Sequence, residues 1–240
     1  MLAGLLVLMT HVPLVQQVLQ KGIIFIDLAI AQIAGLGVIV AVSFDWGSSG
    51  IFVQIAAVTA ALSATVLLQW TERHWPDIQE AIIGVLFILA ASASILVLAE
   101  NPHGGEHLKD LLVGQILWVT PSMLGPVAVV YAIVMILWFN LARLGSFGFY
   151  GIFAIAITAS VQLVGVYLVF ASLIIPALAT LRLTGMVRLA AGYGIGALGY
   201  LTGLVFSTVW DFPPGAVIVW ALLVWGVLSS AAIASWYRPT

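Results

Sequence analysis

The chain contains no cysteine and very little charge. Its 240 residues include seven Lys and Arg and nine Asp and Glu, so that only 7% are charged, against about 25% in a typical soluble domain. The absence of cysteine excludes disulfides and thiolate metal sites, and it leaves the redox compartment undetermined. The net charge of -2 offers no basic surface, so no nucleic-acid partner is expected.

Several catalytic and processing motifs are also missing. The chain has no Walker phosphate-binding loop, so we do not expect it to hydrolyse ATP itself. It has no H-E-x-x-H motif and no pair of intramembrane aspartates, which disfavours an intramembrane enzyme. The first segment lacks the basic start and the small-residue cleavage site of a signal peptide. No catalytic residue and no tightly bound cofactor are therefore expected.

Apolar residues dominate what is present. They make up 63% of the chain, and the mean hydropathy is +1.22, which predicts an all-α, polytopic membrane bundle. Counting apolar segments of about 20 residues gives about eight or nine spans in one domain, residues 1–240. Residues 2–20 are marginal, because polar residues interrupt them; either this helix is short or the true start lies upstream. Thr120 and Pro121 predict a helix start.

The longest uncharged run, residues 144–181, lies between Arg143 and Arg182. Its 38 residues would extend roughly 57 Å as one helix, whereas the hydrocarbon core is about 30 Å thick. The run therefore crosses twice, or crosses once and re-enters. Gly165 and Pro176 are the places where we expect it to turn or loosen.

The distribution of basic residues favours two crossings. If Lys21 is cytoplasmic and the run crosses twice, six of the seven Lys and Arg lie on one side and only Lys109 lies outside. A single crossing would move Arg182, Arg188 and Arg238 to the outside and remove this asymmetry. The positive-inside rule therefore favours two crossings. The loops then placed outside are residues 45–50, 100–110 and 211–215.

Polar side chains inside the predicted spans are the candidates for a transport path, because such groups need partners in lipid. Asp27 is the only acidic residue in the interior of a predicted span. A charge inside the membrane is a functional candidate. The alternative is a carboxylate stabilised at a helix N-terminus just past Lys21. Gln32 either lines a pore or bridges helices. The other candidates are Gln115, Gln162, Ser172 and Pro176; for the amides and the serine, helix–helix hydrogen bonding is the competing interpretation.

The loop at residues 100–110 contains the most metal-like cluster. His103, Glu106 and His107, with two further carboxylates nearby, include the ligand types that hold a divalent ion. Against this, Gly104 and Gly105 break the helix that would place both histidines on one face.

A cluster of glycines later in the chain predicts close helix packing or a dimer seam; its members are Gly192, Gly194, Gly196, Gly199 and Gly203.

Four segments, taken in order, resemble the membrane permease subunits of bacterial ABC importers for zinc, manganese or iron. Their sequences are E-A-I-I-G at residues 80–84, L-L-V-G-Q-I-L at 111–117, G-V-Y-L-V-F-A-S-L-I-I-P-A-L-A at 165–179 and D-F-P-P-G-A at 211–216. The family patterns that they resemble are D-A-x-I-G, L-L-F-G-x-I-L, G-x-L-L-V-x-A-L-L-I-I-P-A-A and D-x-P-x-G-A. Together the segments extend across most of the chain.

The resemblance implies a multi-pass protein of the bacterial cytoplasmic membrane that moves a divalent cation, zinc or manganese, by alternating access. It also implies a homodimer around a central pore, set in membrane lipid. A separate cytoplasmic ATPase and an extracytoplasmic metal-binding protein are the implied partners.

Two segments depart from the family pattern. The family's second span carries S-H-A; here, aligning Gly37 puts Gln32 at the place of the histidine, whereas aligning Asp27 shifts this by one residue. The family's cytoplasmic coupling helix is reduced to residues 140–148, where Ala142, Arg143 and Gly145 are the residues that would couple to the ATPase. The alternative is a divergent protein of the same fold that does not pump, and acts as a scaffold or as an ATPase-independent metal transporter.

Overall fold

The computed structural model describes residues 1–21, 25–44, 50–98, 111–114, 116–139 and 141–236, and these residues form helices and no β-strand. The helices are α1 (Leu2–Lys21), α2 (Ile26–Ser43), α3 (Gly50–His74), η1 (Pro76–Ile78), α4 (Gln79–Leu98), η2 (Ile116–Trp118), α6 (Pro121–Phe139), α7 (Leu141–Val164), α8 (Val166–Ala179), α9 (Gly185–Trp210) and α10 (Pro214–Trp236).

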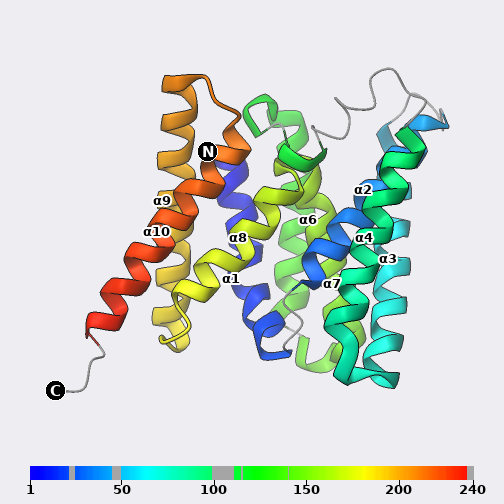
Figure 1. The fold of residues 1–240 in the computed structure, drawn as a ribbon, viewed down its shortest axis with the longest axis horizontal. Helices are drawn as coiled ribbons and strands as arrows, with labels where there is room; N and C mark the ends of the chain where they lie inside the picture. Colours follow the sequence, from blue (N-terminus) through cyan, green and yellow to red (C-terminus); the bar gives the residue numbers. More distant parts are fainter. Residues whose placement is uncertain (22–24, 45–49, 99–110, 115, 140, 237–240) are drawn as a thin grey trace.

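The long helices run side by side between two ends of the molecule (Figure 1). Arg73 near the end of α3, Arg182 after α8 and Arg188 at the start of α9 lie at one end, which we call the inner end. The opposite end is called the outer end. Within the described residues, six helices are long and apolar enough to span a membrane, and α7 with α8 forms a further, bent pair. The predicted polytopic all-α architecture is therefore confirmed.

The uncharged run forms this bent pair. The chain bends by 119° between α7 and α8. The bend is at Gly165, whose φ of 80° is one that glycine adopts without steric cost. α8 leads back toward the inner end, where α7 begins (Figure 1), as the charge distribution predicted. The 14 residues of α8 extend about 21 Å, so the returning limb is shorter than the hydrocarbon core. Pro176 lies inside α8 and does not end it.

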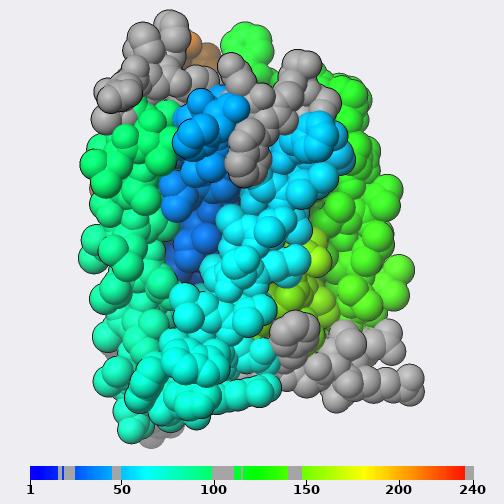
Figure 2. Space-filling model, turned by 90° about the vertical axis from the view of Figure 1, so that its right-hand side faces the viewer, coloured from blue at the N-terminus to red at the C-terminus, as the bar shows by residue number. Residues whose placement is uncertain are grey.

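α2 packs between α3 and α4, which are joined through η1 at the inner end. Gln79 fastens this connection, since its Nε2 donates to the Leu68 carbonyl at 3.0 Å and its Oε1 accepts from the Thr71 hydroxyl at 2.9 Å. Figure 2 shows α2, in blue, lying between α4 and α3 and set back behind them. These three helices form one side of the molecule.

α1 and α10 both pack against α9 through its glycines. A Cβ atom on Gly196 would come within 2.4 Å of Leu8 in α1, and one on Gly199 within 2.4 Å of Leu222 in α10. Both glycines therefore serve helix packing within the chain, which is one of the two roles that the sequence left open. α1 forms a helix over residues 2–21, but its apolar part, Leu2–Val15, is short.

Candidate functional site

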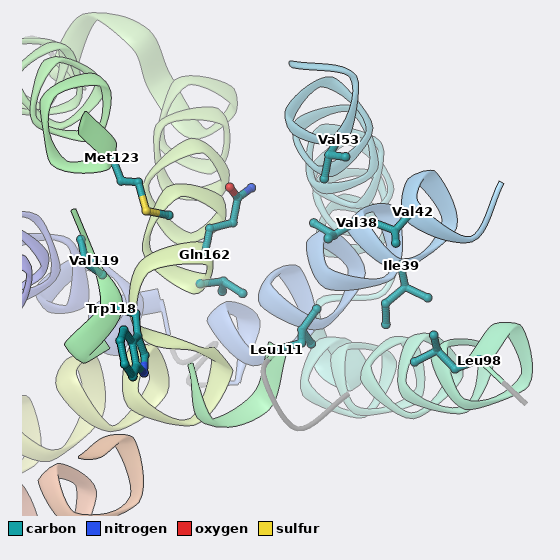
Figure 3. A pocket seen from close by; sticks show the side chains of 11 residues that line it. Val38, Ile39, Val42, Val53, Leu98, Leu111, Trp118, Val119, Met123 and Gln162 are labelled. Atoms are coloured by element: carbon teal, nitrogen blue, oxygen red, sulfur yellow. The ribbon is translucent and has the colours of Figure 1, made fainter. Parts of the chain in front are cut away.

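A cavity of about 350 Å³ lies at the outer end, between two groups of helices. One wall comes from α2, α3 and α4, and the other from η2, α6 and α7 (Figure 3). Eleven described side chains line it. Ten of them are apolar, among them Ile39, Val53 and Val161, and the remaining one is Gln162. In Figure 3, Gln162 projects from α7 into the space between the two groups.

Of the residues that the sequence predicted for the transport path, Gln162 lines this cavity. Gln54 Nε2 donates a hydrogen bond to Gln162 Oε1, which joins α3 to α7. Gln162 Nε2 is buried and has no acceptor among the described residues. The sequence did not single out Gln54; the signal that was available is a lone amide within an apolar span.

A second polar contact joins the same two helices near the inner end. The Tyr150 hydroxyl of α7 interacts with the carboxylate of Glu72, which lies in the last turns of α3. The sequence singled out neither residue, because a hydroxyl near the start of one helix and a carboxylate near the end of another give no local pattern. α3 and α7 are thus in polar contact near both of their ends.

Asp27, the predicted intramembrane charge, is 1% exposed and lies in the first turn of α2. Its carboxylate lies against the backbone N–H groups of Asp27 and Leu28, but neither oxygen makes a hydrogen bond of normal geometry with a described residue. Glu80, at the start of α4, is close enough to interact with it electrostatically. The first-turn position agrees with the helix-terminus interpretation, and the unpartnered oxygens agree with the functional one.

Gln32 is buried to the same extent on the same helix. It is 1% exposed, and its Oε1 has no hydrogen-bond donor among the described residues. An uncompensated amide oxygen inside a bundle is costly. Gln32 and Asp27 thus both place on α2 buried oxygen atoms that have no hydrogen-bond partner among the described residues.

Ser172 and Pro176 lie on the buried side of α8. The Ser172 hydroxyl hydrogen-bonds the Leu168 carbonyl at 2.5 Å and the Tyr200 hydroxyl at 2.8 Å, which joins α8 to α9. This is the helix–helix hydrogen bond of the competing interpretation. Pro176 borders a small hollow between α1, α8 and α9. A role in the transport path stays a prediction for both residues.

Three of the four sequence motifs meet at one point near the outer end. A Cβ atom on Gly165 would come within 2.4 Å of the Gly114 nitrogen, and one on Gly215 within 2.1 Å of the Val113 carbonyl oxygen. Gly114 itself has a φ of 73°. The segment 111–114 therefore touches both the α7–α8 bend and the first turn of α10, and only glycine permits this approach. We call this contact the glycine crossing.

The remaining predictions fall on residues whose structure is not described in full. His103, Glu106, His107 and Gln115 lie outside the described residues. The backbone of Ala142, Arg143 and Gly145 forms the start of α7, and their side chains lie outside the description. Within the described part of the chain, no three His, Cys, Asp or Glu side chains come together as a metal site would require. Metal capture and ATPase coupling by these residues stay predictions.

The fold is similar to that of a solved structure described as PsaBC from Streptococcus pneumoniae in complex with Fab. The TM-score is 0.76 at 18% sequence identity, and the alignment covers 95% of this chain and 88% of that chain. At this level of identity the likeness shows a shared fold. A search among curated proteins returns no match.

A scan against models of protein families matches the ABC 3 transport family. The matches cover residues 1–144 and 139–233, which together include nearly all of the chain. They extend over all four motifs on which the resemblance in the sequence rested, and over every long helix of the bundle. The chain therefore belongs to the ABC 3 transport family, as a membrane subunit of a transporter.

Proposed function

We propose that this chain is the permease subunit of an ABC importer that moves a divalent cation, zinc or manganese, across the bacterial cytoplasmic membrane. In this proposal two copies of the chain form the pore. A separate cytoplasmic ATPase supplies the energy, and an extracytoplasmic metal-binding protein delivers the cation. Family membership supports the importer, and the resemblance of the four motifs supports the metal.

The observation that carries the proposal is the buried carboxylate of Asp27. A charge inside a membrane-spanning helix is expensive and is retained where a cation or a proton needs it. Asp27 and Gln32 offer oxygen atoms without hydrogen-bond partners among the described residues, and oxygen is a ligand that manganese accepts readily. A buried carboxylate on the path would attract a cation and replace part of its hydration shell.

The two polar contacts between α3 and α7 support alternating access. The Gln54–Gln162 pair lies toward the outer end and the Glu72–Tyr150 pair toward the inner end. With both contacts formed, Asp27 is 1% exposed. A cation would reach this carboxylate when one end opens and leave when the other does, and polar pairs are suited to this because they re-form without a large apolar rearrangement.

The test is reconstitution. Purified chain and its candidate ATPase are placed in liposomes, and uptake of radioactive zinc and manganese is measured with and without ATP. We expect ATP-dependent uptake of one of the two metals, and no uptake when the ATPase carries an inactivated nucleotide site. If neither metal moves, and deletion of the chain leaves cellular zinc and manganese unchanged, the proposal is wrong.

One observation favours the non-pumping alternative. α6 ends at Phe139 and α7 begins at Leu141, so the two helices leave little chain between them for a separate coupling helix. Crosslinking from Arg143 or Ser146, at the start of α7, decides between the two functions. Adducts with an ATPase would support the importer, and their absence in membranes that contain the ATPase would support the scaffold.

A further inference from the structure

The chemistry of the outer cavity differs from that of a cation path. Ten of the eleven described side chains that line it are apolar, and no carboxylate or imidazole is among these eleven. A divalent cation requires oxygen or nitrogen ligands, so the described lining offers it almost nothing. The cavity therefore fits an apolar guest.

The cavity is also open to the surroundings of the bundle. Its walls belong to helices long and apolar enough to span a membrane, including α2, α3 and α6. Three of its lining residues are well exposed, Val42 at 42%, Met123 at 48% and Trp118 at 79%, so the cavity is open on their side. The cavity is thus continuous with the apolar surface that faces lipid, and its volume of about 350 Å³ is in the range of ligand pockets, roughly 300–1,000 Å³.

One polar atom in the cavity specifies the guest further. Gln162 Oε1 already accepts a hydrogen bond from Gln54, whereas Gln162 Nε2 is a buried donor without an acceptor among the described residues. A donor without a partner favours a guest that carries a carbonyl oxygen beside an apolar chain. A fatty-acyl ester combines these two groups.

The position of the cavity identifies the leaflet. The cavity lies at the outer end, opposite Arg73, Arg182 and Arg188, which the positive-inside rule places at the cytoplasmic side. We propose that the cavity binds one acyl chain of a glycerophospholipid from the outer leaflet, and that Gln162 Nε2 donates a hydrogen bond to the ester carbonyl of that lipid. The bound chain packs against both helix groups.

The site is tested with a phospholipid that carries a photoreactive diazirine in its acyl chain, in nanodiscs that contain the unmodified protein. Irradiation is followed by digestion and mass spectrometry of the labelled peptides. We expect adducts at Ile39 and Val161, which are 4% and 5% exposed and therefore inaccessible to lipid that merely covers the surface. Adducts confined to exposed residues such as Met123 would overturn the proposal, as would crosslinks between two copies of the chain through this cavity in place of lipid adducts.

Two tryptophan variants localise the effect. Val53→Trp fills the cavity, and Val42→Trp narrows its exposed rim without entering the packed interior. Both are expected to reduce labelling of Val161 severalfold. The matched control is Val129→Trp on the lipid-facing side of α6, where the native residue is 61% exposed; it should leave the labelling unchanged. Equal labelling in all three variants would contradict the proposal.

The hydrogen bond is tested by changing the lipid. An ether-linked phospholipid has the same chains without the carbonyl, so the unmodified protein should retain it about fivefold less well than the ester, as loss of one hydrogen bond predicts. Gln162→Leu should retain both lipids equally. If the unmodified protein does not distinguish ester from ether, Gln162 is not the donor and this part of the proposal is wrong.

Discussion

Gln54 of α3 donates a hydrogen bond to Gln162 of α7 at the edge of the outer cavity. The same two helices meet again near the inner end, where the Tyr150 hydroxyl interacts with the Glu72 carboxylate. Side-chain hydrogen bonds between membrane helices contribute only about 0.6 kcal/mol on average. Such contacts hold a closed arrangement and still release it, which suits the alternating access that we propose.

Locking either contact should stop transport. Gln54→Cys with Gln162→Cys, or Glu72→Cys with Tyr150→Cys, places two thiols in a chain that has no other cysteine. A bifunctional methanethiosulfonate is the suitable bridge, since glutamine-length side chains hold backbones farther apart than a disulfide spans. We expect either bridge to abolish metal uptake in proteoliposomes and a reductant to restore it.

The single-cysteine variants treated with the same reagent are the controls for this experiment. They should transport normally, because one thiol cannot form a bridge. If bridged protein transports at the unmodified rate, α3 and α7 do not separate at that end during transport.

Asp27→Asn should reduce metal uptake at least about tenfold, the effect expected when about 1.4 kcal/mol of cation binding is lost with the charge. The amide has nearly the same size, so packing around α2 should change little. Uptake of radioactive metal as a function of concentration measures the effect, and Asp77→Asn, at an exposed position in η1, is the matched control. Unchanged uptake in Asp27→Asn would leave the helix-terminus role as the explanation of this residue.

Gly165→Ala should destabilise the bundle by at least about 2 kcal/mol. Alanine is strained at a positive φ, and its Cβ would overlap the backbone of Gly114. Gly151→Ala, within α7, is the matched control. Nothing lies within 4 Å of a Cβ there, so alanine should be neutral or stabilising by up to about 1 kcal/mol. The apparent melting temperature in detergent distinguishes them, and equal melting temperatures would show that the glycine crossing is not tight.

Ser172→Ala and Tyr200→Phe separate a packing role of Ser172 from a role in transport. If the hydroxyl pair only joins α8 to α9, each variant should lose about 1 kcal/mol of stability and the double variant little more. Transport per folded molecule should then equal that of the unmodified protein. Reduced transport at unchanged stability, found for Ser172→Ala alone, would instead place Ser172 on the path.

The features that the sequence predicted correctly are local or depend on composition. Thr120 and Pro121 predicted the start of α6, and the structure begins that helix at Pro121, with the Thr120 carbonyl accepting from the Met123 N–H at 3.0 Å. The length of the uncharged run and the positions of the arginines predicted a turn near Gly165 and a return to the inner end. Each of these inferences needs only a few neighbouring residues or a charge count.

The features that the sequence did not reveal depend on contacts between distant residues. Gln54 and Gln162 are 108 positions apart, and both occur in apolar segments that give no indication of their partner. The bend at Gly165 was expected, but its contact with Gly114 depends on how residues 111–114 pass over it. Helix packing decides such pairings, and a single sequence does not record it.

The glycine crossing has a consequence for the order in which the protein assembles in the membrane. Gly215 closes the crossing from one side, and it follows Gly114 by about a hundred positions in the chain. During synthesis the α7–α8 bend is therefore made before α10 arrives to cover it. The contact between Gly215 and Val113 can form only after α9 and α10 have been inserted, so truncation before Gly215 should leave a chain that enters the membrane but does not complete the crossing.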